Sequence, residues 1–218
     1  MHFNITVTNK SHEKYADFIC ELMEKAAKVR GTGIAKRKPE YIKKKMAQGH
    51  AVIALDKDIA IGFCYIESWG GKKYVSNSGL IIHPDYRKQG LAKAIKKEIF
   101  ELSKSKFPDA KLFGITTSMA VMKINSDLGY KPVAFSELTT DEDFWKGCQN
   151  CTNYDVLQRT NKSMCLCTGM VCDFKESKMQ VVEDKKSWEK FIQFLKDRKN
   201  RIQEKAKLFP KLLKRINY

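Results

Sequence analysis

Six consecutive residues, Arg87-Lys88-Gln89-Gly90-Leu91-Ala92, combine the residue types that bind a phosphate group. They lead into a segment whose apolar residues recur at helical spacing, and the first turn of a helix presents unpaired N–H groups and partial positive charge. Gly90 lets the backbone approach a bulky anion, and Arg87 with Lys88 adds positive charge. A glycine before an amphipathic helix is also common where no phosphate binds, so the spacing alone leaves both interpretations open.

A strand and a helix must position this loop. Residues 74–82 are rich in β-branched and apolar side chains and end before Pro84, which predicts a strand and then a turn at His83-Pro84-Asp85. From Leu91 the apolar stripe predicts a helix that reaches Leu102. The solvent-facing side of this helix is expected to hold Lys93, Lys96, Lys97 and Glu101.

The other elements are predicted from apolar periodicity and turn residues. Before the loop we expect a strand at 3–7, a helix from a Ser11 cap to about Arg30, a helix from Pro39 to Gly49, and a hairpin of strands 50–55 and 59–68. After it we expect a strand at 111–117, a helix, a strand at 131–135 and a last strand at 164–171. Apolar residues at Trp188, Phe191, Ile192 and Leu195, and again from Leu208 to Ile216, indicate a helical extension.

Cysteines cluster late in the chain, as Cys148-x-x-Cys151, Cys165-x-Cys167 and Cys172. The first two pairs could hold zinc, which binds thiolates. Against this, residues 164–171 form a predicted strand, where cysteines pack as small hydrophobic groups, so we expect no metal. The segment 144–147 is expected to fold over the site, with a core position for Trp145 as the alternative.

Composition limits the classes of partner. The 218-residue chain has a formal net charge of +16, and residues 175–218 hold 14 Lys/Arg against 6 Asp/Glu. Anionic partners are favoured, but no basic stripe interleaved with aromatics indicates nucleic-acid binding. No apolar run reaches the length of a membrane span or of a signal-peptide core, and seven cysteines, an odd number, fit a reducing compartment. We therefore expect a cytoplasmic protein that binds neither nucleic acid nor membrane.

The pattern Arg-x-x-Gly-x-Ala after an aliphatic strand and a proline resembles the acyl-CoA loop of the GNAT family (Gcn5-related N-acetyltransferases). Leu128-Gly129-Tyr130 before a strand is similar to a second mark of that family. The resemblance implies an α/β fold in which a mixed, twisted central sheet of about seven strands is flanked by helices. It places an acyl-CoA N-acyltransferase domain at residues 1–174 and leaves 175–218 as a basic helical C-terminal extension, packed on the domain or on a second subunit, which is compatible with a homodimer.

The resemblance also implies which residues bind the substrates. The acyl-CoA donor would be held by Leu80, Ile81, Ile82, Arg87, Lys88, Gln89, Gly90, Leu91, Ala92, Lys93 and Ser118. In that fold the central strand separates from its neighbour and leaves amides free, so a backbone N–H at Ile81 or Ile82 would polarise the thioester carbonyl. The connection between the first two helices would line the acceptor pocket, where Arg30, Arg37 and Lys38 suit a carboxylate. We assign Lys43 to Lys45 to a solvated helix face instead.

Acyl transfer to an amine needs a base for the amine proton. Glu67 is the candidate, at the end of strand 59–68 on the same face as Phe63 and Tyr65. A surface Glu at a strand end is the alternative interpretation. The turn residues His83 and Asp85 are weaker candidates, although the pKa of histidine suits the task.

The thiolate that departs needs a proton, and its donor is open. The family places an asparagine at a helix start and a tyrosine seven residues later, and this chain has Ser118 and Asn125 there. An amide does not act as an acid. Either another group, such as Tyr154 or a cysteine, protonates the thiolate, or CoA leaves as the anion.

Three longer runs, TGIAKRKPEYI, AVMKINSDLGYKP and FSELTTDEDFWKGCQNCTNYDVL, resemble a GNAT subgroup of Bacteroides-type bacteria that tends to be encoded with arginine-biosynthesis enzymes. This implies transfer of an acetyl or succinyl group, from acetyl-CoA or succinyl-CoA, to the α-amine of a small acidic acceptor such as glutamate. Two alternatives stay open. One is a protein or peptide acetyltransferase acting on lysine or N-terminal amines, which the basic rim disfavours; the other is a non-catalytic acyl-CoA-binding regulator, suggested by Asn125.

Overall fold

A computed structural model of the chain describes residues 3–30, 36–149, 151, 153–174, 188–190, 192–197 and 200. The chain divides into two compact units, Met1–Phe174 and Lys175–Tyr218. In the second unit Trp188, Phe194 and Leu195 are exposed. The predicted apolar positions Phe191 and Leu208 to Ile216 lie outside the described residues. Among the described helices, none is long and apolar enough to cross a membrane.

The first unit is built on one seven-stranded sheet in the order β1-β2-β3-β4-β5-β7-β6. The strands are β1 Asn4–Val7, β2 Ala51–Asp56, β3 Ile59–Trp69, β4 Tyr74–Ile82, β5 Lys111–Thr116, β6 Lys131–Val133 and β7 Thr168–Asp173. β4 and β5 run parallel, and the other neighbours run antiparallel. The mixed sheet flanked by helices is confirmed, and it agrees with the GNAT fold.

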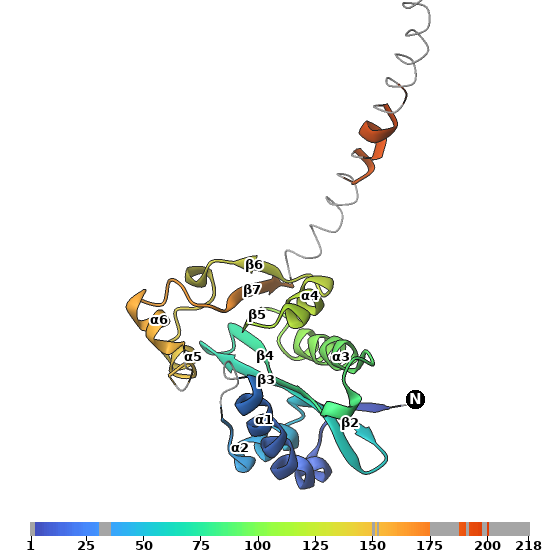
Figure 1. Ribbon diagram of the computed structural model, residues 1–218, viewed down its shortest axis with the longest axis vertical. Helices are drawn as coiled ribbons and strands as arrows, with labels where there is room; N and C mark the ends of the chain where they lie inside the picture. Colours follow the sequence, from blue (N-terminus) through green and yellow to red (C-terminus); the bar gives the residue numbers. More distant parts are fainter. Residues whose placement is uncertain are drawn as a thin grey trace, which may run out of the picture. The chain divides into compact units, whose positions relative to one another are not determined.

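Helices cover both faces of this sheet. They are α1 Ala16–Arg30, α2 Pro39–Ala47, α3 Leu91–Lys106, α4 Met119–Asp127, α5 Glu142–Lys146 and α6 Tyr154–Arg159. Figure 1 shows α1 and α2 on one face and α3 with α4 on the other. The apolar residues follow the same division: Ile19, Ile42 and Tyr65 belong to the core under α1 and α2, whereas Ile95 and Ile99 belong to the core under α3.

β4 and β5 separate part of the way along their length. They pair only at Tyr74–Lys111, Val75–Leu112 and Ser76–Phe113, although β4 continues to Ile82. β5 stays paired with β7 on its other edge as far as Thr116, so it keeps its course while β4 turns away. The sheet therefore opens between these two strands, as the sequence resemblance implied.

A bulge in β4 helps to produce this turn. The register between β3 and β4 shifts between Phe63 and Tyr65, opposite the stretch that contains Gly79. Gly79 has a φ of +64°, and a Cβ there would lie 2.5 Å from Cε1 of Tyr65. Only glycine fits both the backbone conformation and the space at this position.

Three local expectations are wrong at the level of single residues. Asn9, not Ser11, caps the first helical turn, because its side chain accepts from the Ser11 amide. The strand expected at 131–135 ends at Val133, and Phe135 turns into a third apolar core. β7 begins at Thr168 rather than at residue 164, because its partner strand β5 ends at Thr116, directly opposite. Cys165 and Cys167 therefore precede the strand.

The inner face of α3 is also wider than the predicted stripe. Lys96, Phe100 and Ser103 are buried beside Leu91, Ile95 and Ile99, because α3 packs across several strands. Lys96 is only 3% exposed, so its expected place on the solvent-facing side is wrong. Lys93 and Lys97 do face solvent.

Candidate functional site

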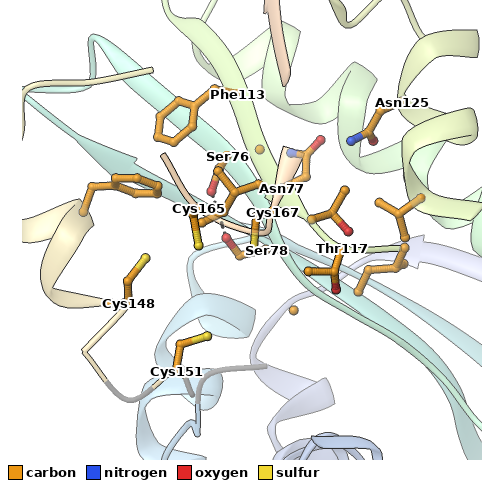
Figure 2. A pocket seen from close by; sticks show the side chains of 18 of the residues that line it. Ser76, Asn77, Ser78, Phe113, Thr117, Asn125, Cys148, Cys151, Cys165 and Cys167 are labelled. Carbon is orange, nitrogen blue, oxygen red and sulfur yellow. Dashed lines mark hydrogen bonds between the residues drawn. The ribbon is translucent and has the colours of Figure 1, made fainter. Parts of the chain in front are cut away.

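A cavity of about 380 Å³ occupies the opening between β4 and β5. β4 contributes Ser76 to Ile81, β5 contributes Phe113 to Thr116, and Thr117 follows. Figure 2 shows Ser76, Asn77, Ser78 and Thr117 in the middle of this cavity, with Asn125 of α4 to one side and Cys148 and Cys151 to the other. The cavity reaches both faces of the sheet, because Met23 and Ala27 of α1 and Lys96 of α3 line it as well.

The start of α3 is the predicted phosphate-binding corner. Gly90 is the N-cap with a φ of +80°, no side chain caps the helix, and no atom lies within 4 Å of the position of a Cβ on Gly90. Arg87, Lys88 and Gln89 are exposed, and Arg87 Nε donates to the carbonyl of Ile82 at 3.3 Å. The first-turn amides are therefore accessible and lack a side-chain acceptor, so the corner fits a phosphate group. It lies outside the residues that line the cavity itself.

The hydrogen bonds of β4 favour one of the two predicted carbonyl-polarising amides. The His83 amide donates to the Ile61 carbonyl of β3 at 2.8 Å. Because successive amides of a strand point to opposite edges, the Ile82 amide faces away from β3, toward the opening, and the Ile81 amide faces β3. Leu80 and Ile81 line the cavity with their side chains or backbone.

Glu67 lies on β3 under α2 and is mostly buried. Lys45 Nζ donates to Glu67 Oε1 at 2.7 Å, and the Tyr41 hydroxyl donates to Oε2. Burial raises the pKa of Glu67 to about 7 and lowers the pKa of Lys45 to about 8. The assignment of Lys45 to a solvated face is therefore wrong. Glu67 does not line the cavity, but its strand neighbours Tyr65 and Trp69 do.

Arg37 connects the cavity to the basic segment before α2. Its Nε donates to the Tyr65 hydroxyl at 2.6 Å, and its side chain lines the cavity beside Met23 and Ala27 of α1. A second, open hollow of about 300 Å³ is lined by Lys36, Arg37, Lys38 and Tyr41. Arg37 is thus shared by the cavity and this hollow, and it brings a positive charge to the side of the cavity that α1 lines. Arg30 ends α1, and its side chain is outside what the structure describes.

Asn125 and Lys96 bring buried polar groups to the opposite side of the cavity. Asn125 is 3% exposed, and its Oδ1 has no hydrogen-bond partner among the described residues. Lys96 Nζ lies 5.4 Å from the centroid of the Tyr130 ring, and burial lowers the pKa of Lys96. Periodicity alone did not predict that Lys96 is buried. The signal that could have found it is its place between Ile95, Ile99 and Phe100 on the helix surface.

The remaining sequence candidates take structural or peripheral places. Ser118 is the N-cap of α4, and its Oγ accepts from the Val121 amide at 3.4 Å, while Thr116 and Thr117 line the cavity instead. Nδ1 of His83 is 3.7 Å from Asp85 Oδ2 at the outer turn. Tyr154 does line the cavity.

Four cysteines, Cys148, Cys151, Cys165 and Cys167, line the same cavity from the side opposite Asn125 (Figure 2). Burial raises the pKa of the Cys148 thiol to about 11, and burial with the nearby Cys165 raises the pKa of Cys167. Within the described part of the chain, no three His, Cys, Asp or Glu side chains are placed to hold a metal ion. Phe144 and Gly147 line the cavity, whereas Trp145 packs in the third core and donates its Nε1–H to the Thr139 carbonyl at 3.0 Å.

Comparison with known sequences gives a similarity over part of the chain. The profile of the acetyltransferase (GNAT) family matches residues 18–119, which include most of α1, the opening between the strands and the first residue of α4. No protein of curated function matches the sequence.

Solved structures share the fold at low sequence identity. N-acetylglutamate synthase from Neisseria gonorrhoeae, complexed with coenzyme A and N-acetyl-glutamate, superposes with a TM-score of 0.57 at 13% identity, over 80% of this chain and 35% of that one. The yncA protein from Salmonella typhimurium, with its cofactor acetyl-CoA, superposes with a TM-score of 0.54 at 9% identity, over 80% of this chain and 95% of that one. Diaminobutyrate acetyltransferase EctA from Paenibacillus lautus, complexed with L-2,4-diaminobutyric acid and coenzyme A, superposes with a TM-score of 0.54 at 9% identity. The superposition covers 79% of this chain and 96% of that one.

This chain spans about a third of the length of the Neisseria enzyme. Over residues 18–119, a little less than half of its length, the chain is similar to the acetyltransferase (GNAT) family, and the solved structures named above share its fold.

Proposed function

We propose that the chain is an N-acyltransferase that moves an acetyl or succinyl group from CoA to the amine of a small acidic acceptor such as glutamate. The observation that carries the proposal is the cavity between the separated strands, beside a helix start that has accessible amides and no side-chain cap. Solved structures of the same fold that contain CoA or acetyl-CoA support an acyl-CoA donor.

The donor would lie along β4. Amides of Leu91, Ala92 and Lys93 and the charges of Arg87 and Lys88 would hold its phosphates at the start of α3. The pantetheine arm would enter the opening past Leu80, and CoA supplies the activated thioester. The Ile82 amide would then donate to the thioester oxygen and stabilise the negative charge that develops there.

The acceptor would occupy the side of the cavity that Arg37 and α1 line. The Arg37 guanidinium and the Lys38 ammonium would pair with its carboxylates. Glu67, with a pKa of about 7, is ionised in a large fraction of molecules at neutral pH and can accept the amine proton. Because Glu67 does not line the cavity, a bridging water would carry the proton to it.

We assign this activity to residues 1–174 and regard the basic residues 175–218 as an extension. All seven cysteines are free thiols, which supports a reducing compartment such as the cytoplasm. A role in arginine biosynthesis follows from glutamate as acceptor and from the sequence resemblance given above.

Release of free CoA, followed with a thiol reagent, tests the proposal. The purified protein is mixed with acetyl-CoA or succinyl-CoA and with glutamate or a lysine-containing peptide. CoA release that depends on glutamate is the expected result. Release only with the peptide would favour a protein acetyltransferase, and tight CoA binding without turnover would favour a regulator.

A further inference from the structure

We propose that Lys96 receives the sulfur of coenzyme A and donates the proton that the departing thiolate needs. The inference deepens the proposed function and rests on it. It answers the question left by Asn125, which stands in the sequence where the resemblance would place a tyrosine that could donate a proton. Lys96 reaches the same cavity as Asn125 from a different helix, α3.

The ammonium of Lys96 is buried without a counter-charge. Lys96 is 3% exposed, and within the described residues no hydrogen bond or ion pair joins its Nζ to an acceptor. The groups that face it are the Tyr130 ring and the Cys64 thiol of β3, and Cys172 of β7 lies near Tyr130. Burial raises the pKa of Cys64 and of Cys172 to about 11, and it raises the pKa of Tyr130 well above its ordinary value, so all three are neutral at neutral pH. An unpaired buried cation is costly, and such groups are found where function needs them.

Asn125 supplies the second unpaired group. Its Oδ1 has no partner in the described structure, and its Nδ2 has only a 3.7 Å contact with the Met170 sulfur. Tyr130 links the two residues, because its amide donates to the Asn125 carbonyl at 3.0 Å while its ring lies beneath Lys96 Nζ. Lys96 and Asn125 therefore both line one cavity, and Oδ1 of Asn125, which neighbouring atoms cover, reaches a ligand there after a rotation of the side-chain amide.

A thiol and its thiolate match both groups. The thiolate accepts from the ammonium of Lys96, and the thiol formed from it can donate S–H to Asn125 Oδ1. A carboxylate carried by the acyl group would satisfy Lys96 but would place a second acceptor against Asn125 Oδ1. The pair of groups therefore favours sulfur over a carboxylate.

The step balances without a further reactant. The tetrahedral intermediate collapses, the bond between carbon and sulfur breaks, and its electron pair stays on sulfur. A proton moves from Lys96 Nζ to the sulfur, so CoA leaves as the thiol and Lys96 is left as a neutral amine. Solvent returns a proton to Lys96 when the products leave. Burial lowers the pKa of Lys96, which makes it a stronger acid than an exposed lysine.

Binding of two ligands tests the contact with sulfur directly. Titration calorimetry compares CoA with desulfo-CoA, which lacks the sulfur atom. The wild-type protein is expected to bind CoA at least about 10-fold more tightly than desulfo-CoA, because only CoA has a sulfur that can accept from the Lys96 ammonium. Lys96→Met should remove this difference, and Lys97→Met, the exposed lysine next to it on α3, should keep it.

Turnover tests the proton transfer. Lys96→Met is expected to lower kcat by about 10²- to 10⁴-fold, the usual contribution of a general acid, with the KM for glutamate nearly unchanged. Methionine is apolar and of similar length, and replacement of a buried charge by an apolar side chain is often tolerated. Lys96→Leu is a second variant, and the wild-type ligand comparison needs no variant at all.

Four results would overturn the inference. The first is equal wild-type affinity for CoA and desulfo-CoA, and the second is a kcat of Lys96→Met within threefold of wild type. The third is a fall in kcat of Lys96→Met with succinyl-CoA only, which would assign Lys96 to a donor carboxylate. The fourth is a fall in kcat of Tyr154→Phe without one in Lys96→Met. A wild-type protein that binds no CoA refutes the proposed function as well. CoA binding without a preference for sulfur refutes only the role of Lys96.

Discussion

Glu67→Gln should change the pH dependence of the reaction as well as its rate. Glu67 is buried between β3 and α2, where burial raises the pKa of its carboxyl to about 7. The substitution keeps the size of the side chain and a hydrogen-bond acceptor for the Tyr41 hydroxyl, but it removes the group that can take a proton. The fold should therefore survive while the base is lost.

The magnitude follows from this pKa. With a pKa of about 7, roughly 10% of Glu67 is ionised at pH 6 and roughly 90% at pH 8. Loss of a general base costs about 10²- to 10⁴-fold in rate. The ratio of kcat/KM between wild type and Glu67→Gln should therefore reach about 10² or more at pH 8 and fall about 10-fold at pH 6.

The assay is CoA release at saturating acyl-CoA, measured from pH 6 to pH 8.5 for wild type, Glu67→Gln and Glu101→Gln. Glu101 is exposed on α3 and serves as the matched control, whose profile should follow wild type. The ratio between enzymes cancels the titration of the acceptor amine, which is common to all three. A ratio that is constant from pH 6 to pH 8 would refute the raised pKa, and a ratio near one would refute the role of Glu67 as base.

Three further predictions test other parts of the structure. Arg87→Ala should weaken CoA binding by up to about 10-fold in calorimetry with little change in kcat, because the exposed Arg87 would contact the CoA phosphates and not the reacting atoms. Unchanged affinity for CoA would contradict the assignment of the loop at Gly90 to phosphate binding. Arg37→Ala should raise the KM for glutamate by about 10-fold or more, because a guanidinium that pairs with a carboxylate is lost, and an equal effect on an uncharged amine acceptor would argue against that pairing. Gly79→Ala should lower the free energy of unfolding by about 1–3 kcal/mol in urea titration, more than Gly71→Ala does. Both glycines have positive φ, but only at Gly79 would a Cβ collide with Tyr65, so equal losses would contradict the steric argument.

Local patterns predicted most elements of the fold, because their signals lie within a few residues. The strand before Pro84, the loop at Gly90 and the helix from Leu91 each have their own residue types, and the structure places all three where the pattern put them. The family resemblance then supplied what no local pattern contains, namely the opening between β4 and β5.

Features that depend on contacts between distant segments were not predicted. Glu67 meets Lys45, 22 residues away, and nothing in either segment indicates that both are buried. Lys96 lies at the edge of the apolar stripe of α3, and whether such an edge is buried depends on how many strands the helix crosses. The start of β7 depends on the end of β5, about 50 residues earlier in the chain, so Cys165 and Cys167 could not be placed from their own sequence.

The position of β7 determines when the sheet of this protein can finish folding during synthesis. β7 lies between β5 and β6, so β6 leaves the ribosome before the neighbour that it needs has been made. Until residues 168–173 emerge, the edge of β5 that faces away from β4 has no partner strand. β5, which lines the cavity, is then paired only with β4, over three residue pairs. A nascent chain that ends before Thr168 should therefore be unable to retain an acyl-CoA ligand, even though the helix start that we propose binds its phosphates was translated long before.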